Sequence, residues 1–123
     1  MAKKSLNKVL LIGNVVKDPT IRKTPNGTSI CTFTIATNNR YKKPDGSYQE
    51  VAHFHRIVAW SKLADVCAQN LKKGTRVFVE GELRNRKIEV DGTQKQVTEI
   101  RIVDMQVLRH PQNTITVSEQ TES

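Results

Sequence analysis

The sequence has few of the residues that could hold a small protein together through covalent or metal bonds. It contains two cysteines, Cys31 and Cys67, and no C-x-x-C pair. Cys31 alternates with apolar residues, as in a strand, and Cys67 lies in an apolar stripe with helical spacing, so both are predicted to be small core residues. His53 and His55 are too few to form a zinc site, which needs four ligands at recognised spacing. We therefore expect no disulfide, no metal and no cofactor.

Long apolar segments are also lacking. No stretch is long enough to cross a membrane, and the start MAKKSLNK has no apolar core typical of a signal peptide. These absences favour a protein of the cytoplasm, associated with the nucleoid if its partner is DNA. A chain of 123 residues fits one domain with a real core. We expect that domain to span residues 1–109, followed by a short polar tail at 110–123.

Negative charge is in short supply. The chain has 12 acidic against 20 basic residues, which gives a net charge of +8 and a pI near 9.8. Such an excess favours a polyanionic partner. Nucleic acid is a better candidate than a membrane surface, because the sequence has no basic amphipathic helix.

The remaining pattern is that of strands separated by turns. Pro25-Asn26-Gly27 and Asp91-Gly92 are turn signals, Pro44-Asp45-Gly46 marks the tip of a polar loop at 38–50, and Gly81 indicates a bulge or bend. Apolar alternation between them predicts five strands, over residues 6–16, 28–37, 51–60, 75–90 and 95–108.

One segment, 61–74, has helical spacing instead. Ser61 is expected to cap its N-terminus, Lys72 and Lys73 to lie near its C-terminus, and Gly74 to end it. Five strands with one helix between the third and the fourth are the layout expected of an all-β OB-fold barrel, which commonly binds oligonucleotides.

Aromatic residues are scarce, at 5% of the chain, yet two of them lie in one strand, HFHRIVAW at 53–60. Strand alternation places Phe54, Arg56 and Trp60 on one face. A buried arginine is costly, so this face is predicted to be an open one, where rings stack on bases and the guanidinium contacts a phosphate or base. The alternative interpretation is that Trp60 fills the barrel as a core residue.

Further candidates surround this strand. Tyr41, in the basic loop, is a possible third stacking platform. The cations expected to contact DNA are Lys62 and Lys73 beside the helix and Arg84, Arg86 and Lys87 in the fourth strand.

These segments, in order and spacing, resemble the bacterial-type single-stranded DNA-binding protein (SSB) family from about Asn7 to Leu108. The matching segments are NKVLLIGNVVKDPTIR, PNG, FTIAT, HFHRIVAWSKLADV and LKKGTRVFVEGELRNRK. The resemblance implies an OB fold, a homotetramer that wraps single-stranded DNA without sequence preference, and roles in replication, recombination and repair. It implies stacking roles for Tyr41, Phe54 and Trp60, and a subunit-interface role for His55. It also implies DNA contacts for Arg56, Lys62, Lys73, Arg84 and Arg86.

Two features depart from the family pattern. Ile88 lies where the family often has another stacking aromatic, so it is expected to be only a weak platform. The chain ends in HPQNTITVSEQTES rather than in a long linker with an acidic, Phe-ended tip. Recruitment of replication and repair proteins through such a tip is therefore not expected.

Other functions would require different features of the sequence. A nuclease would need a carboxylate cluster with a base. Glu80 and Glu82 are the nearest pair, but they lie among arginines and have no histidine partner, so we expect them to balance charge and the protein not to be an enzyme. A primosome-type OB-fold adaptor and an RNA-binding OB protein remain open as alternatives.

Overall fold

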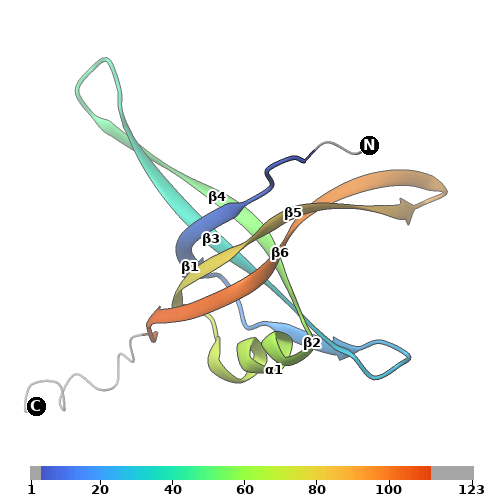
Figure 1. Cartoon of the computed structure of the whole chain (residues 1–123). Helices are drawn as coiled ribbons and strands as arrows, with labels where there is room; N and C mark the ends of the chain where they lie inside the picture. Colours follow the sequence, from blue (N-terminus) through green and yellow to red (C-terminus); the bar gives the residue numbers. More distant parts are fainter. Residues whose placement is uncertain (1–3, 112–123) are drawn as a thin grey trace, which may run out of the picture.

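Strands make up most of the chain in the computed structural model, which describes residues 4–111 (Figure 1). The elements follow one another as β1 (Val9–Val15), β2 (Thr20–Lys23), β3 (Ser29–Lys42), β4 (Tyr48–Trp60), α1 (Ser61–Asn70), β5 (Arg76–Val90) and β6 (Thr93–Arg109). The predicted tail lies, from residue 112 onward, outside the described residues.

The sheet closes into a barrel. Its strands are ordered β1-β5-β6-β4-β3-β2, and β1 pairs in addition with β3. All pairs are antiparallel except β4 with β6, which are parallel at Ile57–Ile100 and Val58–Arg101. At the β1–β3 contact Gly13 packs closely, because a Cβ there would lie 2.4 Å from the carbonyl oxygen of Ala36. The five long strands are thus the barrel, and β2 is an edge strand paired with β3.

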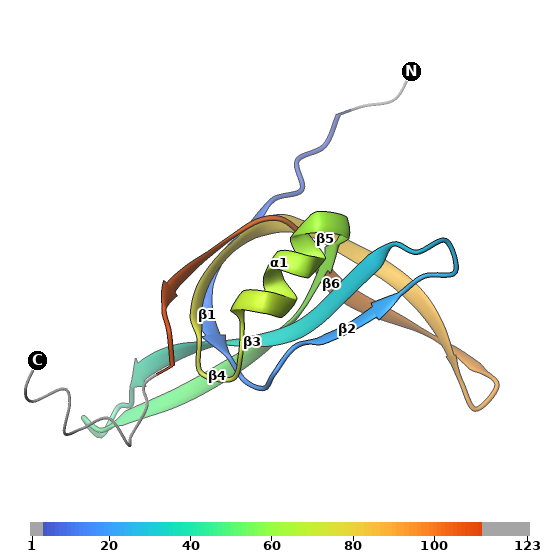
Figure 2. The same ribbon diagram turned by 90° about the horizontal axis from the view of Figure 1, so that it is seen from below.

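Alternate residues of these strands fill the barrel. Its buried core consists of Val15, Cys31, Phe33, Ile35, Ile57, Ala59, Ala64, Cys67, Leu71, Val77, Val79, Ile100 and Ile102. Helix α1 lies across one end of the barrel, where it contributes Ala64 and Cys67 (Figure 2). Burial raises the pKa of the Cys31 thiol to about 11 and that of Cys67 to about 12, so both thiols stay protonated. The prediction that both cysteines are core residues is confirmed.

The predicted all-β barrel is confirmed at the level of its five long strands and single helix, which lies between the third and fourth of them. The sequence did not reveal β2. All four of its residues are exposed, so it lacks the apolar alternation that marks a half-buried strand.

The predicted loop at 38–50 was wrong in extent. The β3–β4 register runs without interruption from Ile30–Trp60 to Lys42–Tyr48, so most of this segment is strand. Only residues 43–47 turn, with hydrogen bonds from Gly46 N to Lys43 O and from Lys43 N to Ser47 O. The arms of this hairpin are exposed on both faces beyond the barrel, and polar residues there do not alternate with apolar ones.

The predicted helix ends were also wrong. Trp60 is the N-cap and no side chain caps the helix, while Ser61 is its first residue, at φ 61°. The helix ends at Asn70, and Leu71 caps it through its N–H to the Cys67 carbonyl. Residues 72–74, where the sequence predicted the last turn, form a turn instead, in which Gly74 N donates to Val15 O. Contacts with β1 therefore override the local helix signals.

The β5–β6 hairpin follows the sequence prediction. Asp91 and Gly92 both have positive φ, at 51° and 80°, as a two-residue hairpin turn of this kind requires. The register shifts at Gly81, which pairs with Ile102 while Glu80 pairs with Asp104, so Val103 is the extra residue of a bulge. The predicted irregularity at Gly81 is confirmed.

Candidate nucleic-acid interface

The outer face of β4 carries the residues that the sequence placed together. Phe54, Arg56, Val58 and Trp60 lie opposite small or β-branched residues of β3, the last pair being Trp60 with Ile30. The other face of β4 contributes Ile57 and Ala59 to the core. The predicted alternation is confirmed.

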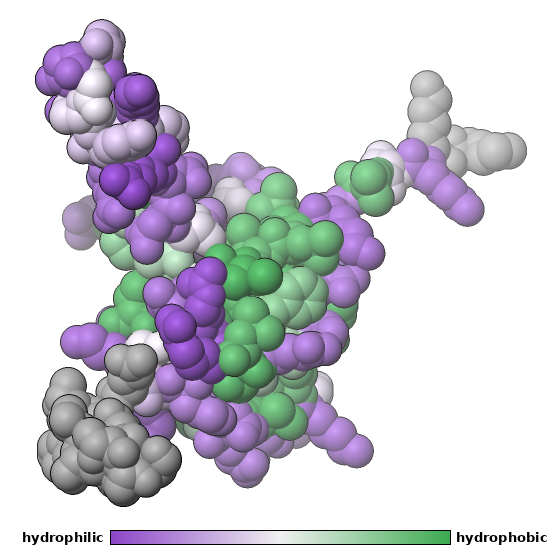
Figure 3. Space-filling view, turned by 90° about the vertical axis from the view of Figure 1, so that its left-hand side faces the viewer, coloured by the Kyte–Doolittle hydropathy of each residue, from purple (hydrophilic) through white to green (hydrophobic). Residues whose placement is uncertain are grey.

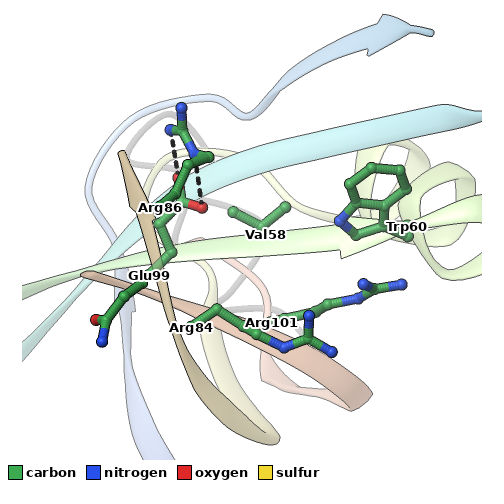
Figure 4. A pocket seen from close by; sticks show the side chains of 7 residues that line it. Val58, Trp60, Arg84, Arg86, Glu99 and Arg101 are labelled. Carbon is green, nitrogen blue, oxygen red and sulfur yellow. Dashed lines mark hydrogen bonds and ion pairs between the residues drawn. The ribbon is translucent and has the colours of Figure 1, made fainter. Parts of the chain in front are cut away.

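A groove follows this face between the β2–β3–β4 side and the β5–β6 hairpin. Two adjoining hollows share Val58, Trp60, Arg86 and Glu99, and we call them together the central groove. Its lining is completed by Arg22, Ile30, Thr32, Arg56, Arg84, Asn85 and Arg101. Five arginines and one glutamate thus line it, around the indole of Trp60 and the aliphatic side chains of Ile30 and Val58. Figure 4 shows the part of the groove where Arg84, Arg86 and Arg101 lie around Val58 and Trp60.

Trp60 belongs to this groove. It is partly exposed and is not a member of the barrel core. The guanidinium of Arg101 lies over its ring, 4.9 Å from the ring centre, a cation–π arrangement. Trp60 therefore does not have the full burial expected of a barrel-filling residue.

Glu99 lies in the same groove, where it accepts hydrogen bonds from arginines of two different strands, β4 and β5. Its Oε2 accepts hydrogen bonds from Arg56 Nε and Arg86 Nη2, each at 2.8 Å, and its Oε1 accepts one from Arg86 Nε at 3.3 Å. Figure 4 shows the Arg86–Glu99 pair beside Val58, with Trp60 beyond it. Hydrogen bonds from Arg86 hold the pKa of Glu99 below its ordinary value, against the effect of its burial. The carboxylate therefore stays ionised at neutral pH.

The groove continues toward β2. A neighbouring polar hollow is lined by Lys17, Asp18, Thr20, Arg22, Thr32, Phe33, Thr34 and Arg56. Arg22 and Arg56 belong to both parts, so a basic path runs from the β5–β6 hairpin across β4 to β2 and β3.

The β3–β4 hairpin carries the more distant aromatics. Phe54 is 66% exposed and lies on the Arg56 face. Tyr41 is exposed but pairs with Gln49, which places it on the opposite face of the ribbon from Phe54. Tyr48 lies on the Phe54 face instead, with the Arg40 guanidinium 4.2 Å from its ring centre. The structure thus brings Tyr48, which the sequence prediction omitted, to the face of Phe54.

The candidates on β5 are separated by strand alternation. Arg84 and Arg86 line the central groove, and Arg84 also pairs with Glu82 at 2.7 Å. Lys87 is exposed on the other face, opposite Gln96. Ile88 is partly buried opposite Lys95, on the face of Arg86 but nearer the hairpin tip.

The two lysines near the helix lie apart from these arginines. Lys62, in the first turn of α1, and Lys73, in the turn after it, are exposed and do not line the hollows described above. The backbone N–H of Lys73 donates to Asp18 at 2.8 Å. Any contact they make with DNA lies outside the central groove.

His55 lies on the other face of β4 from Arg56. Its Nε2 is 2.9 Å from Thr37 Oγ1, across the β3–β4 pair. Burial, and secondarily the charge of His53, lowers its pKa. His55 is therefore largely neutral at neutral pH.

Glu99, Arg101 and Arg22 are the charged groove residues that sequence reasoning missed. Glu99 and Arg101 alternate with Ile100 and Ile102, and this alternation was the available signal. It shows an outer face but not that this face lies beside Trp60, since that follows from the parallel β4–β6 pairing of segments more than 40 residues apart.

Glu80 and Glu82, the nearest pair of carboxylates to a catalytic one in the sequence, are engaged in ion pairs. Glu80 lies 3.0 Å from Lys8 and Glu82 lies 2.7 Å from Arg84, in keeping with the predicted charge balance. Within residues 4–111 no cluster of three or more His, Cys, Asp or Glu side chains could hold a metal ion. In the same part of the chain, no helix has the length and apolar character needed to span a membrane.

Comparison with known proteins identifies relatives along almost the whole chain. Residues 6–108 match the Single-strand binding protein family. The chain is 48% identical over 107 residues to "Single-stranded DNA-binding protein 1" of Chlorobaculum tepidum, a match that covers 85% of this chain and 66% of that relative.

Solved structures similar to this chain are also those of single-stranded DNA-binding proteins. A Plasmodium falciparum SSB in complex with ssDNA matches with a TM-score of 0.79 and 35% identity, over 88% of this chain and 99% of that one. A deletion mutant of the single-stranded DNA binding protein from Thermus aquaticus matches with a TM-score of 0.74 and 33% identity, over 85% of this chain and 51% of that one.

Proposed function

The chain belongs to the single-strand binding protein family, and on that premise we propose that it binds single-stranded DNA without sequence preference. Its role is then to protect exposed strands during replication, recombination and repair, in the cytoplasm, as a binding protein rather than an enzyme. The observation that carries this proposal is the central groove, in which a partly exposed indole lies among five arginines.

The chemistry of the groove suits a single strand. Unpaired bases expose flat faces, and Trp60 offers an aromatic ring to stack on, with Phe54 further along the same strand face. Arginines contact phosphates, which are identical at every nucleotide and carry no sequence information. A duplex hides the faces of its bases, so it cannot use the ring without the cost of unpairing.

Each predicted contact residue has a place in this proposal. Phe54 and Trp60 are the principal platforms, with Tyr48 beside Phe54, and Tyr41 and Ile88 contribute less. Arg56, Arg84 and Arg86 contact phosphates or bases in the groove, while Lys62, Lys73 and Lys87 contact a strand that wraps beyond it.

We also propose that the protein is a homotetramer, the assembly that the family resemblance implies. β1 is apolar on both faces, since Val9 and Leu11 pack on the core while Leu10 and Ile12 are 58% and 49% exposed. Figure 3 shows a hydrophobic area on the side of the molecule where β1 lies. Subunits are proposed to meet there, with His55 at an interface.

Fluorescence titration tests the proposed function directly, because Trp60 is the single tryptophan of the chain. Oligo-thymidine should quench its emission strongly and saturably, and a matched duplex should not. Oligo-uridine of equal length distinguishes DNA from RNA, and tighter binding to it would favour the RNA-binding alternative. The absence of saturable quenching together with no retention of labelled oligo-thymidine would contradict the proposal.

A further inference from the structure

Glu99 is unusual among the charged residues of the molecule. Within residues 4–111 it is the only charged residue that is buried, with 8% of its surface exposed, and it lies in the middle of an arginine-rich groove. A buried carboxylate is costly unless it is paired and hydrogen-bonded. On charge alone, it also opposes the binding of a polyanion in that groove.

The hydrogen bonds of Glu99 fix two arginines from different strands. Arg56 of β4 donates only its Nε, and Arg86 of β5 donates Nε and Nη2 in a two-point contact. An arginine has five N–H donors in a rigid plane. Both terminal nitrogens of Arg56 and the Nη1 of Arg86 are therefore left to face other partners. Both side chains are about half exposed, at 48% and 49%, so these donors are accessible.

We propose that Glu99 is a positioning residue for DNA binding. It holds the Arg56 and Arg86 guanidinium groups in fixed orientations on the two sides of the groove, so that their remaining donors bind successive phosphates of the strand. The inference rests on the proposed function and names a residue that contributes to binding although its own charge repels the ligand. A free arginine loses side-chain entropy when it binds, and a pre-oriented one loses less.

Whether one substitution weakens or strengthens DNA binding distinguishes a positioning role of Glu99 from a purely electrostatic one. Glu99→Gln keeps the shape of the side chain but removes the charge that holds both guanidinium groups. Positioning predicts that binding of oligo-thymidine becomes about tenfold weaker, since two arginines must then be ordered on binding. It also predicts a flatter dependence of log K on log salt, because fewer phosphates are engaged. If Glu99 only neutralised charge, its removal would strengthen binding and steepen the salt dependence.

Glu82→Gln is the matched control. Glu82 lies on the same hairpin and pairs with Arg84 at 2.7 Å, but its side chain is 39% exposed. Exposed ion pairs orient their partners weakly. We expect this variant to bind oligo-thymidine as tightly as the wild type or somewhat more tightly.

Arg86→Lys provides a second measurement, which does not alter the buried carboxylate. Lysine keeps the charge but cannot make the two-point contact with Glu99. Positioning predicts a several-fold loss of affinity in a protein that still folds, and less effect for the control Arg84→Lys. The inference is overturned if Glu99→Gln folds and binds as tightly as the wild type, or if Arg86→Lys matches Arg84→Lys. Failure of the wild type to bind oligo-thymidine would contradict the proposed function instead.

Discussion

The two faces of the Trp60 ring have different environments. Arg101 pairs with Val58 in the parallel β4–β6 contact. Its guanidinium covers one face of the ring, 4.9 Å from the ring centre. A base can stack on the remaining face and have the guanidinium behind the indole, or it can displace Arg101. In the free protein the arginine keeps the ring at the groove surface, because a cation packed on an aromatic face stays partly hydrated.

The Trp60→Ala variant should lose binding rather than stability. Stacking contributes about 1–3 kcal/mol per base, so affinity for labelled oligo-thymidine should fall by about that free energy per engaged site. Loss of a buried core tryptophan would instead cost about 3–5 kcal/mol of folding free energy. Thermal melting and anisotropy titration separate these effects, and Trp60→Phe, which keeps a ring, should recover most of the affinity. A large drop in melting temperature with binding intact would show that the ring is structural.

At this scale the sequence predicted the residues of one strand better than their neighbours. The period of two in 53–60 was enough to place Phe54, Arg56 and Trp60 on one face. Glu99 was out of reach, because its hydrogen bond to Arg56 joins residues 43 positions apart. Tyr41 was assigned by its position in a basic segment, whereas the register of the β3–β4 ribbon decides its face.

Among the elements, β6 shows how one extra residue adapts a strand to a barrel. Ile100 and Ile102 point into the core before the bulge, and Met105 and Val107 pack against it afterwards, so Val103 shifts the alternation by one. Gly81 is the partner residue at which this shift occurs. A Cβ at Gly81 would lie 2.2 Å from the carbonyl oxygen of Arg101 and 2.7 Å from the Cα of Ile102.

We therefore expect Gly81→Ala to destabilise the fold by about 1–3 kcal/mol, the usual cost of forced overpacking. Backbone atoms oppose the added methyl group, so side-chain repacking cannot relieve the contact. Gly46→Ala, at a hairpin tip where a Cβ meets nothing within 4 Å, is the control and introduces only a backbone penalty at φ 92°. Urea unfolding measures both variants against the wild type, and a Gly81→Ala midpoint equal to that of the wild type would show that the bulge tolerates the methyl group.

The sequence predicted the segments that bury one face in the barrel core. It did not predict the segments that are exposed on both faces. Strands β3 to β6 carry apolar alternation where they line the barrel, and each was expected at these positions. The outer arms of the β3–β4 hairpin and the whole of β2 are exposed and polar. Backbone pairing and surface contacts such as that of Arg40 with Tyr48 hold them, and backbone pairing leaves no mark on side-chain type.

At the scale of the whole molecule, the apolar surface of β1 is separate from the basic groove. The exposed apolar residues Leu10 and Ile12 lie on β1, whereas the arginines of the central groove come from β2, β4, β5 and β6. β1 contributes no residue to the described hollows of the groove. Assembly through β1 would therefore leave the groove open to DNA.

Light scattering after gel filtration should give the mass of a tetramer at micromolar concentration. Replacing Leu10 and Ile12 together by glutamate should lower that mass, because charges would have to be buried at the proposed subunit contact. Val90→Glu is the control. Val90 is also an exposed apolar residue, with 40% of its surface exposed, but it does not lie on β1, so this variant should leave the mass unchanged. A monomer mass for the wild type would contradict the assembly, and a stable dimer would favour the adaptor alternative.

The pairing of β1 has a consequence for the order in which the chain is synthesised. Val9 pairs with Gly81, and only Asn14 and Val15 find partners earlier, on β3. At roughly 5–20 residues per second, about 4–14 s separate the synthesis of Val9 from that of its partner. During that interval a strand with apolar side chains on both faces leaves the ribosome with most of its backbone unpaired. The basic residues Lys4 and Lys8, immediately before it, lie where charges best hinder pairing with another nascent chain.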